Sequence, residues 1–371
     1  MKYPCLFLLF CVSAAQTLHA EIPKALVVPP GFSVETLNFV APNARQMALT
    51  ENGTLILGSR RAGNVYAVPN ALTAPAPDVI TLLSNLRMPS GVAVHNGDLY
   101  VGAVERILKV TDIDSALHAD VSYTVITDQL PGESHHGWKY LKFGPDNALY
   151  VPVGAPCNIC LSADPRFASL LKMDPATGET SIYAQGIRNT VGFDWHPDDG
   201  SVWITDNGRD MMGDDIPPEE INIATRPGKH FGYPFIHGDD IADPEFGQHK
   251  DRSRYTFTAP ALNIQAHSAA LGITFYTHTQ FPKDYKNAVF IAEHGSWNRT
   301  EKVGYQVSVV LKKANGVLSY QPFVTGWLHG QENWGRPNDV LMTPDGSLLI
   351  SDDQGGVVYR VRYTGAIARQ Q

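Results

Sequence analysis

The sequence lacks three features that would point to other classes of protein. No helical spacing of apolar residues separates its strand-like segments, and no stripe or run of basic residues occurs. Beyond residues 1–20, no apolar run is long enough to span a bilayer. The formal net charge is −8. These absences exclude a helical bundle and argue against a nucleic-acid partner or a membrane-spanning segment in the rest of the chain.

The beginning of the chain has the composition of an export signal. Lys2 is its only charged residue, Leu6–Ala15 is apolar, and Leu18–Ala20 ends in a possible cleavage site. A membrane anchor is the alternative, but the apolar run is shorter than the roughly 20 residues that a spanning helix needs. We therefore expect a signal peptide over 1–20, one domain over 21–371, and a periplasmic or secreted protein.

Cysteine is scarce, and its placement is informative. Of the four cysteines, Cys5 and Cys11 would leave with the signal peptide, and only Cys157 and Cys160 would remain. In an exported protein, this spacing predicts a structural disulfide that closes a short loop. A redox-active pair is the alternative, although no βαβ pattern surrounds it.

What the chain does contain is a repeated hairpin. Six times, a turn lies between two apolar strands, and the turns recur about every 45 to 60 residues apart from one longer interval. Asn-Gly and Asp-Gly favour such turns because both residues tolerate positive φ. The six turns are Glu51–Thr54, His95–Asp98, Pro145–Ala148, Asp198–Ser201, Tyr285–Ala288 and Pro344–Ser347.

This repeat predicts an all-β fold, a six-bladed β-propeller whose blades are four-stranded antiparallel sheets. Each hairpin would supply the two inner strands of a blade. Outer strands are expected at 64–68, 107–110, 170–173 and 357–361. Residues 32–37 alternate like a strand and would close the ring by joining the last blade, which removes a free sheet edge. The longer interval, around 206–285, predicts functional loops.

Polar residues gather at one end of the predicted inner strands. All inner strands of a propeller run in the same direction, so the segments that lead into them meet at one face, and the exit segments of the following strands return to that face. The lead-in segments are 43–46, 87–90, 134–137, 186–189, 266–268 and 335–338. The exit segments are 60–61, 105–106, 154–157, 206–209, 293–299 and 352–353. Their Arg, His, Asn, Asp and Glu residues predict a site for a small anionic ligand or a metal.

At these residues the chain resembles the soluble sugar dehydrogenases that use pyrroloquinoline quinone (PQQ), and within them the sorbosone or pyranose dehydrogenase branch. The matching motifs follow the family order and cover most of the chain. They are His135–Lys139 with Phe143–Asp146, Gly154–Cys160, Gly186–Asn189, Thr205–Asp210, Glu219–Asn222, Phe231–Pro234, His267–Gly272, His294–Arg299 and Gly335–Val340.

The resemblance implies a role for particular residues. The first His of the His-His-Gly motif, His135, would be the general base. Arg188, Asn189 and Arg336 would contact PQQ, and so would Asn298 and Arg299, at the position where the glucose-oxidising branch has Lys. The backbone carbonyls of Gly208 and Arg209 would bind Ca²⁺.

The expected function is therefore PQQ- and Ca²⁺-dependent oxidation of an aldose or a related hydroxy-aldehyde, with electrons passing to an unidentified acceptor. Two alternatives stay open. One is a calcium-dependent lactonase, which would hold its metal with side chains such as Asp206, Glu293 and Asn338. The other is a propeller that binds a ligand without catalysis.

Overall fold

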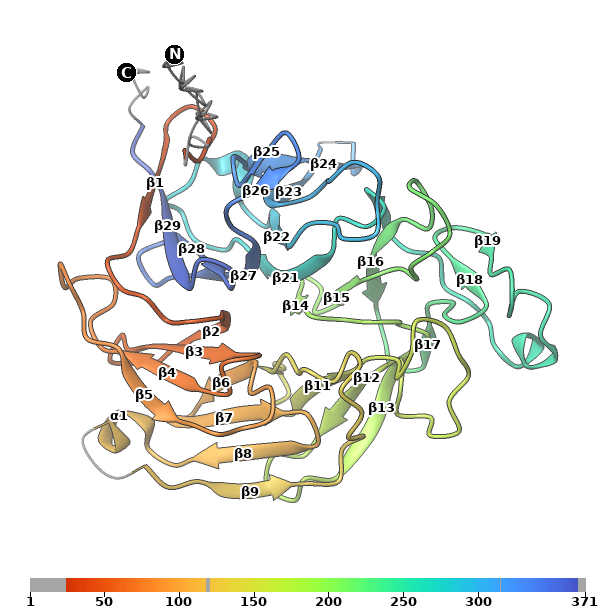
Figure 1. Cartoon of the computed structure of the whole chain (residues 1–371), viewed down its shortest axis with the longest axis horizontal. Helices are drawn as coiled ribbons and strands as arrows, with labels where there is room; N and C mark the ends of the chain where they lie inside the picture. Colours follow the sequence, from red (N-terminus) through yellow and green to blue (C-terminus); the bar gives the residue numbers. More distant parts are fainter. Residues whose placement is uncertain (1–24, 118–120, 314, 366–371) are drawn as a thin grey trace, which may run out of the picture.

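The computed structural model describes residues 25–117, 121–313 and 315–365. Six small sheets are arranged around a central axis, which confirms the six-bladed β-propeller (Figure 1). The expected signal peptide lies outside the described residues. No helix in the described ranges has the length and apolar character needed to cross a membrane.

The first three blades follow one another along the chain. Blade 1 contains β2 (Ala44–Leu49), β3 (Leu55–Ser59), β4 (Val65–Val68) and β5 (Ile80–Leu83). Blade 2 contains β6 (Gly91–His95), β7 (Asp98–Ala103), β8 (Arg106–Val110) and β9 (Thr124–Thr127), with the short helix α1 (Ile113–Ala116) between its last two strands. Blade 3 contains β10 (Lys142–Phe143), β11 (Leu149–Val153), β12 (Ser169–Met173) and β13 (Thr180–Gln185).

The remaining blades complete the ring. Blade 4 contains β14 (Phe193–Trp195), β15 (Val202–Asp206), β16 (Glu219–Ala224) and β20 (Leu262–Ile264). Blade 5 contains β21 (Ala270–Phe275), β22 (Val289–Glu293), β23 (Gln306–Lys312) and β24 (Leu318–Val324), with a 3₁₀ turn at Lys283–Tyr285. Blade 6 contains β27 (Pro337–Met342), β28 (Leu348–Asp352), β29 (Val357–Tyr363) and β1 (Phe32–Thr36).

The long interval in blade 4 holds short elements rather than a further blade. β17 (Lys229–His230) pairs in parallel with β13 and so extends the sheet of blade 3. β18 (Ile236–His237) and β19 (Ile241–Ala242) form a small hairpin, and a 3₁₀ turn follows at Lys250–Arg254. A second small hairpin, β25 (Leu328–His329) with β26 (Glu332–Asn333), precedes blade 6.

The ring closes through β1, as the sequence predicts. Phe32 to Thr36 pair antiparallel with Tyr363 to Tyr359 of β29, the last strand of the described chain (Figure 1). Phe32 is buried, and its ring meets four aromatic rings edge-on, with centroid distances of 4.8 to 5.3 Å. Those rings belong to Phe281, Tyr285, Phe323 and Tyr363. The predicted closing strand is therefore also a packing element between blades 5 and 6.

Candidate active site

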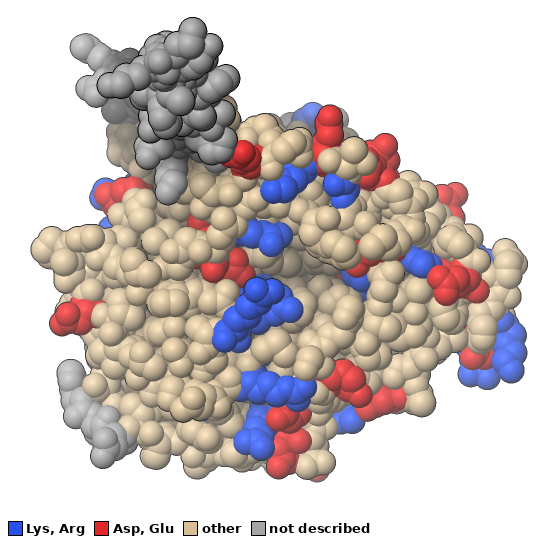
Figure 2. Space-filling model, viewed as in Figure 1, with Lys and Arg blue, Asp and Glu red and all other residues tan. Residues whose placement is uncertain are grey.

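The lead-in and exit segments meet at one cavity of about 210 Å³ at the end of the propeller axis. Figure 2 shows Lys and Arg side chains beside a hollow near the middle of this face. The lead-in segments contribute Arg45, His136, Arg188, Asn189, His267 and Arg336 to the cavity wall, and Trp138 follows directly after one of them. The exit segments contribute Arg60, Asn207, Gly208, His294, Gly295 and Trp297, and Asp210 follows directly after one of them. Five of the six blades thus place side chains around one small space, as the common strand direction predicts, whereas the segments of blade 2, at 87–90 and 105–106, do not line it.

Shifts in strand pairing register in three inner strands help to orient these side chains toward the cavity. β2, β21 and β27 each show a shift of register near the end that faces the cavity, at Ala44/Met47, Ala270/Ile273 and Pro337/Asp339. A β-bulge of this kind bends the strand and redirects a side chain that regular alternation would point elsewhere. Arg45 lies inside the first of these shifts, and its side chain reaches the cavity.

Two of the four cavity arginines are held by acidic side chains. Arg45 is buried and pairs with Asp353 at 2.7 Å. Asp353 also contacts Nε2 of His294 at 2.7 Å, and its pKa is lowered because cationic groups and this contact outweigh the effect of burial. Arg188 is likewise buried and pairs with Asp210 at 3.0 Å.

The other two arginines have no carboxylate partner among the described residues. Arg336 donates from Nε to the carbonyl oxygen of His294 (2.9 Å) and from Nη2 to that of Gly295 (2.7 Å). The guanidinium of Arg60 lies 3.8 Å from the ring centroid of Trp138. Burial, together with repulsion by Arg45, lowers the pKa of Arg60 to about 10. Positive charge therefore exceeds its local compensation, so the cavity favours an anionic ligand.

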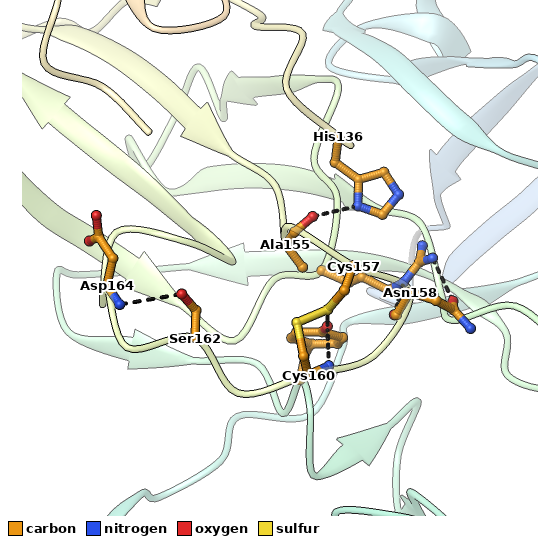
Figure 3. Close-up of a disulfide and its surroundings, with 9 residues drawn as sticks. His136, Ala155, Cys157, Asn158, Cys160, Ser162 and Asp164 are labelled. Atoms are coloured by element: carbon orange, nitrogen blue, oxygen red, sulfur yellow. Dashed lines mark hydrogen bonds between the residues drawn. A yellow bond between two sulfur atoms is a disulfide. The ribbon is translucent and has the colours of Figure 1, made fainter. Parts of the chain in front are cut away.

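A neutral histidine faces the same space. Nδ1 of His136 lies 2.9 Å from the carbonyl oxygen of Ala155, so it carries the proton and leaves Nε2 as an acceptor (Figure 3). Burial, helped by the charge of Arg188, holds the pKa of His136 well below its usual value. Gly154 allows this placement, because a Cβ there would come within 2.5 Å of the Cβ of His136.

The structure thus separates the two neighbouring histidines. His136 is buried and lines the cavity, whereas His135, which the resemblance marks as the base, is exposed and does not contribute to the cavity wall. The two ring centroids lie 4.1 Å apart, so His135 is next to the site although it does not line the cavity.

Two buried carboxylates lie beside Gly208, and one of them, that of Glu219, belongs to a residue of the cavity wall. Glu219 accepts hydrogen bonds from the backbone N–H groups of Gly208 (2.8 Å) and Ala269 (3.1 Å). Asp206 accepts from the backbone N–H groups of Arg188 and Asn189, at 2.9 and 2.8 Å. Burial raises the pKa of Glu219 to about 8 and that of Asp206 to about 7. A cation bound nearby would favour the charged forms of both groups.

The side chains of three residues that the resemblance implicates do not line the cavity, although for Arg209 the resemblance implicates the backbone carbonyl. The Arg209 side chain turns outward to Asp243 (2.6 Å) and Glu245 (2.8 Å) of the long blade-4 loop. Arg299 binds Asp215 at 3.0 Å and the carbonyl oxygen of Asp214. Neither Asn298 nor Arg299 contributes to the cavity wall, which ends at Trp297 in this segment.

The side chains that a lactonase would use do not come together. Glu293 is buried within its own blade, where Gln306 (2.9 Å) and Tyr320 donate hydrogen bonds to it. Asn338 accepts hydrogen bonds from Arg45 when its amide oxygen faces that side chain, at 2.8 Å from Nη2. In the described part of the chain, no group of three or more His, Cys, Asp and Glu side chains is arranged to hold a metal.

Comparison with known proteins adds a family assignment. A family described as "Domain of unknown function (DUF7133)" matches residues 78–361. The chain belongs to this family. A relative from Borreliella burgdorferi, described as an uncharacterized protein, is 33% identical over 370 residues, which cover 96% of this chain and 95% of the relative.

Solved structures share the fold at low sequence identity. The AA12 carbohydrate-active enzyme of Trichoderma reesei superposes with a TM-score of 0.77 at 20% identity, over 94% of this chain and 100% of that one. The PQQ domain of pyranose dehydrogenase from Coprinopsis cinerea, in its holo form, gives 0.75 at 18% identity, over 92% and 98%. The PQQ-bound aldose sugar dehydrogenase of Streptomyces coelicolor gives 0.61 at 18% identity, over 91% and 99%.

Sequence reasoning assigned no individual role to several residues that shape the cavity. Arg45 and Arg60 line the cavity from the lead-in and exit segments of blade 1. The one sequence feature that could have identified them is the presence of arginine in both of these segments, which meet at the same face. The buried pairing of Arg45 with Asp353 joins residues 308 positions apart, so no local pattern could reveal it.

Proposed function

We propose that this protein is an exported, PQQ- and Ca²⁺-dependent dehydrogenase of an aldose or a related hydroxy-aldehyde, similar to sorbosone dehydrogenases. The observation that carries the proposal is the combination of a four-arginine cavity with a buried, neutral His136 at its wall. A triply anionic planar cofactor suits planar guanidinium groups, which pair with carboxylates through two parallel hydrogen bonds. The proteins with the same fold that are described as PQQ-bound or as a PQQ domain support this choice of cofactor.

The residues at the cavity fit such a cofactor. Arg188 uses four of its five guanidinium N–H groups on protein acceptors, which leaves one on Nη1 for a ligand. Arg336 uses two of its five, so its guanidinium has more N–H groups to offer. We assign PQQ binding to Arg188, Asn189, Arg336 and Arg60. Asn298 and Arg299 would contact it only if their loop moved.

Calcium is assigned to the backbone carbonyls of Gly208 and Arg209. Within the described residues, neither carbonyl oxygen accepts a hydrogen bond, although the neighbouring carbonyls of Asn207 and Asp210 do. Carbonyl oxygens and carboxylates are the hard ligands that Ca²⁺ takes, and Glu219 and Asp206 lie beside this segment with their negative charge otherwise disfavoured by burial.

The roles of the protein groups then follow from their geometry. When bound, PQQ would accept a hydride from the substrate carbon, and Ca²⁺ would polarise the accepting carbonyl. His136 would take the proton of the substrate hydroxyl at Nε2, because its Nδ1 proton is engaged by Ala155. Ala155 would keep the ring in this tautomer and orientation. Trp138 and Trp297, at the wall, would border the substrate.

The test is reconstitution of the purified mature protein with PQQ and CaCl₂, followed by dye reduction over a panel of aldoses, sorbosone and other hydroxy-aldehydes. Turnover that requires PQQ, Ca²⁺ and one class of sugar supports the proposal. PQQ binding without turnover would favour the non-catalytic propeller. Lactone hydrolysis with Ca²⁺ alone, without PQQ binding, would favour the lactonase.

A further inference from the structure

The Cys157–Cys160 disulfide closes a four-residue loop beside the cavity. In Figure 3, the Asn158 side chain projects away from the two sulfur atoms. A disulfide that closes so short a loop restricts the unfolded chain only weakly, since the entropic effect grows with loop length. The disulfide therefore acts less by destabilising the unfolded chain than by restricting the conformation of the loop residues in the folded protein.

Asn158 is the residue of this loop that contacts Arg188, which lines the cavity. Its carbonyl oxygen accepts from Nε of Arg188, and its Oδ1 accepts from Nη2 of the same side chain, both at 2.8 Å. Its Oδ1 also accepts from the backbone N–H of Asp210 (2.8 Å), and its Nδ2 donates to the carbonyl oxygen of Asp210 (3.1 Å). One side chain thus joins Arg188 to the exit segment of blade 4.

The guanidinium of Arg188 depends on this loop for half of its protein contacts. The remaining two hydrogen bonds go to the carbonyl oxygen of Asn207 (3.0 Å) and to the carboxylate of Asp210 (3.0 Å). Asp210 is itself held by the Asn158 side chain, so loss of that side chain would remove one of the four contacts and loosen the one to Asp210, whereas the contact to the backbone carbonyl depends on the path of the loop. These contacts fix the orientation of the guanidinium, and with it the direction of the one Nη1–H group that remains for a ligand.

The opposite side of the loop is anchored as well. The hydroxyl oxygen of buried Tyr233 accepts from the backbone N–H of Cys160 (3.1 Å) and lies 3.6 Å from Sγ of Cys157. The loop is therefore held between Tyr233 and Arg188, and the disulfide fixes the path between these two anchors. Both cysteines are only partly buried, so a small reductant can reach them.

We propose that Asn158 is a positioning residue for Arg188, and that the Cys157–Cys160 disulfide makes the affinity of the cavity for its anionic ligand depend on the redox state of this pair. The ligand in question is PQQ, so the inference rests on the proposed function. Reduction by a dithiol would break the S–S bond, transfer two electrons and two protons to give two thiols, and convert the dithiol to its own disulfide. The freed loop would then release Asn158 from Arg188.

The first test reads the position of Arg188 without any cofactor. The Nε–Hε resonance of Arg188 is assigned in a ¹⁵N correlation spectrum by its absence in Arg188→Lys. In the oxidised protein, this proton should exchange slowly with water, because the backbone carbonyl oxygen of Asn158 accepts it. Reduction with dithiothreitol and the Cys157→Ser/Cys160→Ser variant should each shift the resonance or accelerate its exchange at least tenfold. Asn158→Ala keeps the carbonyl acceptor but removes the Oδ1 contact to Nη2, so it should shift the resonance. An unchanged resonance in these samples would overturn the inference, whether or not the protein binds PQQ.

The second test measures PQQ affinity by titration in the presence of Ca²⁺. Asn158→Ala and the double serine variant should each raise Kd about tenfold, and dithiothreitol should have the same effect on the wild type but none on the double variant. Ile159→Ala, in the same loop, is the matched control and should leave Kd unchanged. Equal affinity of oxidised and reduced wild type would reject the redox dependence. Absence of PQQ binding in oxidised wild type would reject the proposed function instead and leave the first test to decide the role of Asn158.

Discussion

Nδ1 of His136 lies 2.9 Å from the carbonyl oxygen of Ala155, and this contact fixes which ring nitrogen is available to a substrate. The carbonyl can only accept, so Nδ1 carries the proton and Nε2 is the basic atom. Ala155 belongs to the exit segment of the same blade, so the ring orientation is set by the hairpin itself.

We expect His136→Ala to lower turnover on the active sugar by roughly two to four orders of magnitude, the usual contribution of a positioned general base. PQQ affinity should change little, because arginines rather than His136 hold the carboxylates. His135→Ala is the matched control, since His135 is adjacent in the chain but exposed. Steady-state kinetics with dye reduction would distinguish them. The reverse pattern, with His135→Ala inactive and His136→Ala active, would return the role of base to His135.

The pH profile should reflect the environment of His136. A base must be unprotonated, and burial with the nearby charge of Arg188 lowers the pKa of His136 well below its usual value. We therefore expect kcat to stay constant as the pH falls through 6.5, the ordinary His pKa, and to decline only in more acidic buffer. Measurement of kcat from pH 4 to 8, with saturating PQQ and Ca²⁺, checks this. An acid limb centred at or above about pH 6.5 would point to a solvent-exposed base.

Arg336→Ala should weaken PQQ binding before it affects the chemical step. The side chain has three guanidinium N–H groups beyond those used on His294 and Gly295. A hydrogen bond to a charged group contributes about 1.5–3 kcal/mol, so Kd should rise roughly ten- to a hundredfold. Arg106→Ala removes a half-exposed arginine of blade 2 that does not line the cavity and serves as the control. Unaltered PQQ affinity in Arg336→Ala would exclude Arg336 from the cofactor site.

The fold was predictable because its signal is local and repeated. Each hairpin is specified by a turn such as Asn52–Gly53 and by the apolar residues beside it, and the period sets the number of blades. The convergence of the lead-in and exit segments follows from topology alone. Even the closing strand was visible, since Phe32–Leu37 alternates and precedes the first hairpin.

The finer geometry of the site was not predictable, because it depends on backbone reversals and distant contacts. His136 has a φ of 50°, a left-handed conformation that turns the chain sharply, so motif position alone could not decide which neighbouring histidine faces the cavity. The outward course of the Arg209 side chain depends on Asp243 in a long loop. The role of Asn158 arises from contact with Arg188, which lies 30 positions away.

Lys139 is a buried cation whose removal should stabilise the protein. It is 1% exposed, and burial lowers its pKa to about 7. In the unfolded chain, Lys titrates near 10.4, so between these values the unfolded state binds more protons and stability rises with pH. Lys139→Met, similar in length, should therefore raise the free energy of unfolding by a few kcal/mol at about pH 7 and below, with a gain that shrinks toward pH 10.

Urea titrations of Lys139→Met at pH 6, 7, 8 and 9 would measure this dependence. Lys250→Met, at an exposed position, is the control and should show no comparable gain. A loss of stability in Lys139→Met at pH 7 would mean that the ammonium group makes net favourable interactions, for which Glu105 and Glu133 are the acidic groups that favour its charged form.

Ring closure should depend on a single aromatic side chain. Phe32 is 3% exposed and is the only residue of β1 in the buried class. Its four edge-on aromatic contacts join β1 to residues of blades 5 and 6, whereas the backbone pairing with β29 joins it to blade 6 alone. Truncation of a buried Phe costs about 3–5 kcal/mol, so Phe32→Ala should lower the free energy of unfolding by this amount.

The control is Ser33→Ala, in the same strand but exposed. It preserves the backbone pairing with Arg362 and should change the free energy of unfolding by less than about 0.5 kcal/mol. Chemical denaturation measures both variants, and faster hydrogen exchange of the β29 amides in Phe32→Ala would show that the closing strand itself has loosened. If Phe32→Ala is as stable as Ser33→Ala, closure rests on the backbone ladder and not on this aromatic cluster.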